Sequence, residues 1–289
     1  MMIDVCDVNQ MKPLLAKHGF HFSKAKGQNF LIKSWVPAQI AEQAGVDESC
    51  GVLEVGPGIG PLTQQLCQRA KKVVAVELDT SLKPILDETM AGFDNLTLIF
   101  ENVMKADLAA LVHEHFPDLR PMACANLPYY ITSPILTLLL ESRLFSSVTV
   151  MVQKEVAQRI CAAAGSSDYS AFSVFCNYYA QPQMLFDVSP DCFLPQPKVT
   201  SSVITLKTRP EPACEILDET LFFKVVRASF AMRRKTLVNG LSAGFLQFSK
   251  AELIEILEEC GYDANIRGET LDIHGFAAIA NTMYRRMHV

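Results

Sequence analysis

Four consecutive residues, Asn126, Leu127, Pro128 and Tyr129, bring together groups that could hold the amine of a base. An exocyclic amine is a poor nucleophile because its lone pair is delocalised into the ring. The Oδ1 of Asn126 and the carbonyl oxygen of Leu127 could accept its two N–H groups and leave the lone pair directed at an electrophile. Pro128 stiffens that carbonyl, and Tyr129 offers a stacking face worth about 1–3 kcal/mol. The motif favours group transfer to a base amine, with an ordinary turn as the alternative.

A glycine-rich loop follows a strand-like run at 51–55. Its sequence, EVGPGIGPLT, places glycines at every second position, which lets the backbone approach a ligand closely. The third glycine comes one position earlier than in the dinucleotide pattern G-x-G-x-x-G. No Lys or Arg follows that could bind a phosphate. The loop therefore predicts an uncharged or zwitterionic ligand.

Polar side chains follow the next two strand-like runs. Glu77 comes twenty-one positions after Gly56, a spacing typical of an acid that binds ribose hydroxyls. Asn102 could accept a hydrogen bond from an adenine amino group. Together with the loop, these residues suit S-adenosylmethionine. An NAD enzyme is the alternative, but it needs a hydride-transfer site, and the sequence offers no convincing acid/base pair for one.

Composition limits the possible classes of protein. The chain has 289 residues, of which 49% are hydrophobic, so a sizeable core can form. The longest apolar runs are far below the roughly 18–20 residues of a spanning helix, and the start resembles neither a signal nor a transit peptide. Nine cysteines without a CxxC pair predict free thiols and no metal site. We therefore expect a cytoplasmic protein with no membrane partner.

Charge is unevenly distributed along the chain. The net charge of −5 alone argues against a nucleic-acid partner. However, the stretches 11–35 and 221–240 each contain five basic residues and no acid. Two such basic patches could follow a phosphate backbone, although ordinary solvated faces are the alternative.

The order of predicted elements indicates an α/β protein. Strand-like runs alternate with helix-length segments between 50 and 155, which predicts a mostly parallel sheet covered on both faces. Two later runs, QMLFDV and SSVITLK, could pair as an antiparallel edge. After TRPEPA (208–213) the patterns are only helical. We expect a first domain at 1–210, with an N-terminal extension of about 1–35, and a small all-helical domain at 211–289.

Motifs along nearly the whole chain resemble the KsgA (RsmA) family of small-subunit ribosomal RNA adenine dimethyltransferases. They are KAKGQNFL, EVGPGIGPLT, VVAVELD, NLPYYITSPI, FLPQPKVTSSVI and FAMRRKTLVNGL. The resemblance implies a Rossmann-like class I methyltransferase fold, with a seven-stranded sheet and a helical C-terminal domain. It also implies S-adenosylmethionine-dependent dimethylation, without a metal, of N6 in two adjacent adenosines near the 3′ end of 16S rRNA. The expected partner is 16S rRNA within the 30S subunit or its precursor, and the expected state is a monomer.

The resemblance also assigns roles to individual residues. The target base would be held by Asn126, Leu127 and Tyr129, with Phe193 as a second apolar wall. The expected cofactor-binding residues are Gln28, Asn29, Leu31, Gly56, Gly58, Glu77, Leu78, Asn102, Val103 and Asn126. The expected RNA-binding residues are Lys24, Lys26, Arg233, Arg234 and Lys235.

One residue departs from the family pattern, and two other functions stay open. The family usually has Asp where this chain has Asn102; an amide keeps an acceptor but loses the charge, so we expect cofactor binding to survive. The first alternative function is Erm-like methylation of 23S rRNA adenine. The second is a non-catalytic ribosome assembly or transcription factor on the same scaffold. The FLPQPKV and RRKTL segments favour the small-subunit function, and an intact NLPY with Glu77 favours an enzyme.

Overall fold

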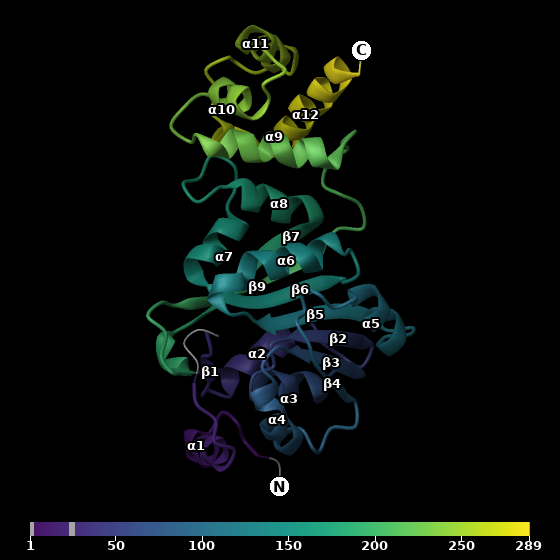
Figure 1. Ribbon diagram of the computed structural model, residues 1–289, viewed down its shortest axis with the longest axis vertical. Helices are drawn as coiled ribbons and strands as arrows, with labels where there is room; N and C mark the ends of the chain where they lie inside the picture. Colours follow the sequence, from purple (N-terminus) through teal and green to yellow (C-terminus); the bar gives the residue numbers. More distant parts are fainter. Residues whose placement is uncertain (1–2, 23–26, 289) are drawn as a thin grey trace. The chain divides into compact units, whose positions relative to one another are not determined.

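A seven-stranded sheet forms the centre of the N-terminal part of the molecule (Figure 1). The computed structural model describes residues 3–22 and 27–288. The strand order is β4-β3-β2-β5-β6-β9-β7, with parallel pairing from β4 to β6 and antiparallel pairing of β6 with β9. This confirms the expected mostly parallel sheet. The strands are β2 (Cys50–Val55), β3 (Lys72–Glu77), β4 (Leu96–Phe100), β5 (Arg120–Asn126), β6 (Ser147–Gln153), β7 (Ala180–Val188) and β9 (Ser201–Thr208).

The central strands are apolar because helices cover the sheet. Every residue of β2 is buried, and five of the six residues of β3 are buried. Such runs form the interior of a parallel sheet rather than a strand with one face in water. The helices that connect the strands are α2 (Trp35–Gln43), α3 (Pro61–Cys67), α4 (Lys83–Thr89), α5 (Leu108–His115), α6 (Thr132–Glu141) and α7 (Lys154–Cys161).

The N-terminal segment packs onto this sheet domain. Helix α1 (Val8–Lys17) is capped by Asp7, whose side chain accepts a hydrogen bond from the backbone N–H of Asn9. The Nε2 of Gln64 donates to the carbonyl of Ile3 at 3.0 Å. A short strand, β1 (Phe30–Leu31), pairs antiparallel with β8 (Phe193–Leu194). The N-terminal extension is thus joined to a segment more than 160 positions later in the sequence.

The remaining helices form a second unit. The helices are α8 (Ala171–Tyr179), α9 (Glu219–Ala231), α10 (Leu237–Gly244), α11 (Lys250–Glu259) and α12 (Ile273–Met287). By their contacts, residues 158–182 and 209–289 form one compact unit, and residues 1–157 and 183–208 form the other. The boundary near 208 lies beside the expected linker, but α8 groups with the C-terminal helices. The division at 210 stays a prediction.

Aromatic packing explains why α8 belongs with the C-terminal helices. The rings of Tyr178 and Phe222 lie 5.3 Å apart, and those of Phe175 and Phe223 lie 5.4 Å apart. Both tyrosine hydroxyls, of Tyr178 and Tyr179, donate to the carboxylate of Glu219 in the first turn of α9. Within residues 3–22 and 27–288, no helix is both long enough and apolar enough to span a membrane.

Candidate active site

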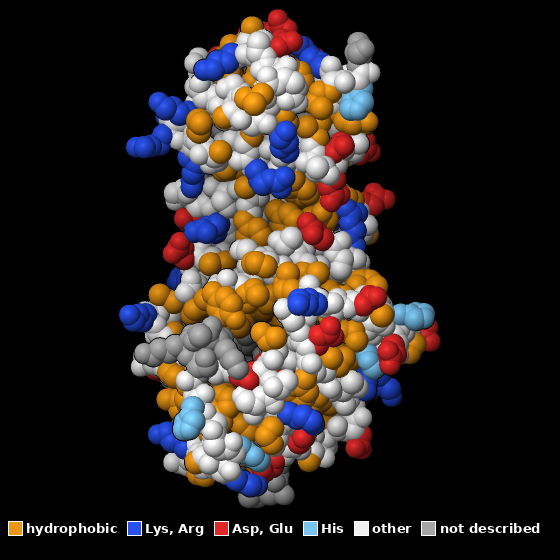
Figure 2. Space-filling model, viewed as in Figure 1, with side chains coloured by type: hydrophobic (Ala, Val, Ile, Leu, Met, Phe, Trp, Pro, Cys, Tyr) orange, Lys and Arg blue, Asp and Glu red, His pale blue; other side chains and the backbone are white. Residues whose placement is uncertain are grey.

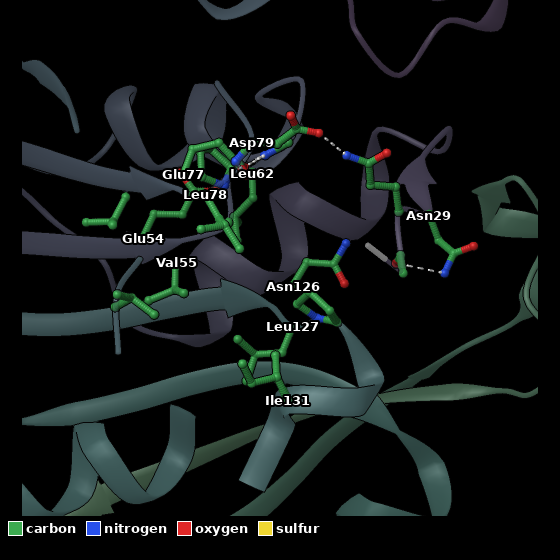
Figure 3. A pocket seen from close by; sticks show the side chains of 18 of the residues that line it. Asn29, Glu54, Val55, Leu62, Glu77, Leu78, Asp79, Asn126, Leu127 and Ile131 are labelled. Carbon is green, nitrogen blue, oxygen red and sulfur yellow. Dashed lines mark hydrogen bonds between the residues drawn. The ribbon is translucent and has the colours of Figure 1, made fainter. Parts of the chain in front are cut away.

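One cavity lies at the carboxyl ends of the parallel strands (Figure 3). All thirteen residues that the sequence assigned to the cofactor or the target base line it. They come from β1 and the segment before it, the glycine loop, the ends of β3 and β5 with the residues that follow them, the turn after β4, and β8. Ligands of open α/β sheets bind at this edge. The structure therefore brings the predicted residues together, and their individual contacts with a ligand stay predictions.

The glycine loop is held in a conformation that favours glycine. Gly56, Gly58 and Gly60 have φ values of 72°, 61° and 96°. At Gly60, an added Cβ would lie 2.4 Å from the Cε of Met90, so a larger residue would also collide with the core. Around Gly56, by contrast, no described atom lies within 4 Å of such a Cβ. The loop leaves open space beside Gly56 that a ligand can enter.

Glu77 at the end of β3 is fixed by two backbone donors. The N–H of Gly58 donates to Oε2 at 3.1 Å, and the N–H of Asp79 donates to Oε1 at 2.8 Å. The side chain is 8% exposed, and burial is the main cause that raises the pKa of its carboxyl group. Each carboxylate oxygen keeps a further lone pair for a ligand. This geometry suits an acceptor for a pair of ribose hydroxyls.

The segment before β1 is connected to the end of β3. The Nε2 of Gln28 donates to Oδ2 of Asp79 at 2.7 Å, and Figure 3 shows this contact above Asn126. The Nδ2 of Asn29 donates to the carbonyl of Gly27 at 3.3 Å. Gln28 and Asn29 therefore form one wall of the cavity.

The Asn126–Tyr129 segment is well fixed at the end of β5. Asn126 pairs with Met151 of β6, and the N–H of Leu127 donates to the carbonyl of Met151 at 3.2 Å. Pro128 then leads into a 3-10 helix at Tyr129–Ile131. In Figure 3 the amide of Asn126 projects from the strand end into the cavity. The two proposed acceptors thus lie on a backbone that sheet hydrogen bonds hold in place.

Two aromatic side chains that the resemblance assigned to the target base, those of Tyr129 and Phe193, line the cavity. The hydroxyl groups of Tyr129 and Ser201 lie 2.8 Å apart, and burial raises the pKa of the Tyr129 phenol. Phe193 is 3% exposed and pairs in register with Leu31. The β1–β8 pair thus places two predicted site residues from distant segments side by side.

Asn102 lies in the cavity but already has a partner. Its Oδ1 accepts a hydrogen bond from the N–H of Met104 at 3.0 Å, which closes a turn after β4. An amide oxygen has a second lone pair. A contact with an adenine amino group therefore stays compatible with this turn.

The predicted RNA-binding residues differ in their surroundings. Arg233 donates from Nη2 to the carbonyl of Ser167 at 2.8 Å, and its Nε lies 3.8 Å from the carboxylate of Glu269. Arg234 and Lys235 are exposed. Lys24 and Lys26 lie outside the described residues. On the face shown in Figure 2, several Lys and Arg side chains lie near one another over the C-terminal helices, whereas Lys and Arg are interspersed with Asp and Glu over the sheet domain.

Sequence reasoning missed several residues of the cavity wall. Glu54, Asp79 and Tyr130 also line it, and Tyr130 is 62% exposed. All three lie within motifs that the sequence analysis singled out: Glu54 in EVGPGIGPLT, Asp79 in VVAVELD and Tyr130 in NLPYYITSPI. In the part of the chain that is described, no group of three or more His, Cys, Asp or Glu residues is arranged to hold a metal ion.

Comparison with known proteins identifies the family. A model of the ribosomal RNA adenine dimethylase family matches residues 19–277. Proteins named ribosomal RNA small subunit methyltransferase A are similar to this chain over 98% of both lengths: that of Bacillus cytotoxicus is 48% identical, and that of Bacillus cereus strain B4264 is 47% identical.

Two solved structures share the fold at 24% identity. A dimethyladenosine transferase from Plasmodium falciparum has a TM-score of 0.76, with 90% of this chain and 98% of that chain covered. The 23S rRNA methyltransferase ErmE has a TM-score of 0.67, with 89% and 100% covered. The match to the family model and the close relatives together show that this chain belongs to the ribosomal RNA adenine dimethylase family.

Proposed function

We propose that this chain transfers methyl groups from S-adenosylmethionine to N6 of two adjacent adenosines in the 3′-terminal hairpin of 16S rRNA. Each adenosine becomes dimethylated during maturation of the small subunit. The observation that carries the proposal is that Asn126, Leu127 and Tyr129 open into the same cavity as Glu77 and the glycine loop. The names of the close relatives support the small-subunit substrate.

The cavity residues fit the proposed methyl donor. Glu77, oriented by two backbone N–H groups, binds the ribose hydroxyls. The open space beside Gly56 accommodates the amino-acid portion, and Asn102 and Val103 lie at the adenine. When bound, S-adenosylmethionine supplies a methyl group activated by a positively charged sulfur.

Asn126 and Leu127 prepare the acceptor nitrogen. The Oδ1 of Asn126 and the carbonyl of Leu127 accept the two N–H groups of the adenine, which favours a pyramidal nitrogen with its lone pair toward the methyl group. The ring of Tyr129 stacks on the base, and Phe193 bounds it. After transfer the surplus proton on the methylated nitrogen leaves to water, so Asn126 does not have to accept a proton.

RNA recognition depends on contacts outside the cavity. Extruding a base from an RNA helix costs a few kcal/mol of lost stacking. Contacts with RNA phosphates and recognition of the RNA shape must offset this cost. Arg234 and Lys235 are exposed and suit this role, with Arg233, Lys24 and Lys26 as further members of the proposed footprint. We place the reaction in the cytoplasm, on the 30S subunit or its precursor, with the enzyme acting as a monomer.

Transfer of labelled methyl groups tests this function. Purified protein and labelled S-adenosylmethionine are incubated with undermethylated 30S subunits and, separately, with naked 23S rRNA. Four methyl groups per 30S subunit are expected, with no labelling of 23S rRNA. Preferential labelling of 23S rRNA would favour the Erm-like function, since this chain shares the fold of the 23S rRNA methyltransferase ErmE. Absence of transfer to either RNA would favour a non-catalytic assembly factor.

A further inference from the structure

Tyr130 is a large aromatic side chain that stays exposed at the wall of the cavity. It lines the cavity together with Tyr129, yet it is 62% exposed. Within residues 3–22 and 27–288, its hydroxyl group has no hydrogen-bond partner. An aromatic ring is a large apolar surface, and a fold that needed this ring for its core would bury it. The ring of Tyr130 is therefore available to a group that approaches the cavity from solvent.

The two tyrosines of this turn point in different directions. They belong to the 3-10 helix Tyr129–Ile131, in which successive side chains are about 120° apart because the helix has three residues per turn. Tyr129 reaches toward β9, where its hydroxyl group lies 2.8 Å from that of Ser201. Tyr130 lies instead against the segment before β1, since a Cβ added at Gly27 would be 3.4 Å from its Cε1. One turn thus presents two rings to different neighbours.

Gly27 allows the backbone to pass close to the Tyr130 ring. Its φ value is 61°, in the region that favours glycine. A Cβ at this position would also lie 3.5 Å from the Cβ of Pro128. The Gly27 backbone therefore supports one side of the ring, while most of the remaining surface of Tyr130 is open to solvent.

The place of Tyr130 beside the proposed base pocket indicates which group its ring contacts. It directly follows Tyr129, on which we propose that the target adenine stacks. In Figure 3, Leu127 and Ile131, on either side of this turn, lie below Asn126. Extruding the target adenosine leaves the neighbouring base without a stacking partner on one face. An exposed aromatic ring suits such a base, because stacking needs only the flat face that every base has.

We propose that Tyr130 stacks on the base next to the target adenosine and is a specificity-determining residue for methyl transfer. The inference rests on the proposed function and deepens it, because the two target adenosines are adjacent and each is the neighbour of the other. Stacking on Tyr130 replaces the contact that the neighbouring adenine loses, which lowers the cost of extruding the target. The ring occupies one side of the base pocket, so it assists at least one of the two adenosines when that adenosine is the target.

Methylation of 30S subunits that lack one base tests the proposal with the full-length protein. Subunits reconstituted with unmodified 16S rRNA are compared with two kinds in which one of the two adenosines is replaced by an abasic nucleotide. Single-turnover rates are measured per remaining adenosine, with the protein in excess over subunits but below its Kd for them, so that binding and extrusion both contribute. For the parent, we expect the rate to fall about tenfold on at least one of the two abasic substrates.

Variants of Tyr130 show whether this loss comes from its ring. Tyr130→Ala should be about tenfold slower than the parent on unmodified subunits. It should lose less than a further twofold on the abasic substrate that slows the parent, since it has no ring for the missing base to contact. Its Kd for S-adenosylmethionine should stay within twofold of the parent's, which also shows that the variant is folded. Tyr130→Phe keeps the ring and should behave as the parent.

Trp35→Ala is the matched control for the loss of an exposed aromatic side chain. Trp35 is 45% exposed and does not line the cavity. This variant should keep the parent's sensitivity to the missing base. Equal loss of that sensitivity in Trp35→Ala and Tyr130→Ala would mean that the effect is not specific to the cavity, and would overturn the inference.

The outcomes separate this inference from the proposed function. A parent protein that methylates none of the three kinds of subunit would overturn the proposed function. Equal rates of the parent on all three would overturn the role of Tyr130 and leave the proposed function in place. The same conclusion follows if Tyr130→Ala stays as sensitive to the missing base as the parent. A tenfold loss of affinity for S-adenosylmethionine in Tyr130→Ala would assign the ring to the cofactor and also overturn the inference.

Discussion

The hydroxyl groups of Tyr129 and Ser201 lie 2.8 Å apart, which connects the segment after β5 to the first residue of β9. The two residues are 72 positions apart in sequence. Because the Tyr129 ring is fixed both at its hydroxyl group and at its Cα, the plane of the ring is held in one orientation. Ser201 is fully buried and is therefore a positioning residue for the surface on which we propose that the adenine stacks.

Loss of this contact should slow methyl transfer without affecting the cofactor. We expect Ser201→Ala to lower kcat roughly 3- to 10-fold, because one partly buried hydrogen bond is lost. The Kd for S-adenosylmethionine should stay the same. Tyr129→Phe removes the same bond from the other side. The double variant should therefore be no slower than either single variant. Additive losses in single-turnover methylation of 30S subunits would show that the two hydroxyls act separately.

The amide at Asn102 should be a tolerated departure from the family pattern. Asn102→Asp keeps the acceptor that closes the turn with Met104. It also places a negative charge beside the position that we propose for the adenine. We expect its Kd for S-adenosylmethionine to equal that of the parent or to be severalfold lower. A large loss of affinity in Asn102→Asp would mean that Asn102 binds the cofactor in another way.

The basic residues after α9 should separate into two groups. Replacing Arg234 and Lys235 by Gln removes two exposed charges, so the slope of log K for RNA against log salt should fall by about 1.4–1.8. Arg233→Gln should change that slope less and lower the thermal midpoint, because Arg233 binds Ser167 and Glu269. Filter binding over a salt series measures the slope. An unchanged slope after neutralising Arg233, Arg234 and Lys235 together would exclude this segment from the RNA footprint.

Burial of the Glu54 carboxyl group should make the stability of the ligand-free protein depend on pH. Its pKa is about 8 in the folded protein and near 4.5 when unfolded, so the folded state holds the proton more tightly. The folded protein gains full stability from this proton below pH 4.5 and loses it progressively as pH rises to about 8. Glu54→Gln should therefore have a thermal midpoint that exceeds the parent's more at pH 8 than at pH 5. Equal differences at the two pH values would mean that Glu54 is not protonated at neutral pH.

The sequence predicted the sheet and the composition of the cavity because both depend on local patterns. Buried runs such as β2 and β3 are apolar throughout, and residues that follow parallel strands meet at one edge of the sheet. Glu77 and Asn126 could therefore be placed in one site from their positions alone.

Other features depend on contacts between distant segments and left no local signal. The strands β1 and β8 have two residues each, too few to show a period, so the pairing of Leu31 with Phe193 could not be predicted. The grouping of α8 with α9 depends on ring contacts such as that of Tyr178 with Phe222. The tether of Arg233 to Ser167 is likewise a tertiary contact, and charge alone marked Arg233 as free to bind RNA.

Methyl transfer by Asn126→Ala tests the central claim most directly. The variant removes one of the two acceptors that we propose for the adenine amine and leaves the backbone hydrogen bond of Leu127 in place. With saturating S-adenosylmethionine and undermethylated 30S subunits, we expect the rate of methyl transfer to fall at least 100-fold, on the order of the effect of removing one positioned group that stabilises a transition state. The affinity for RNA should stay within threefold of the parent's. Transfer by Asn126→Ala at the parent's rate would contradict the account.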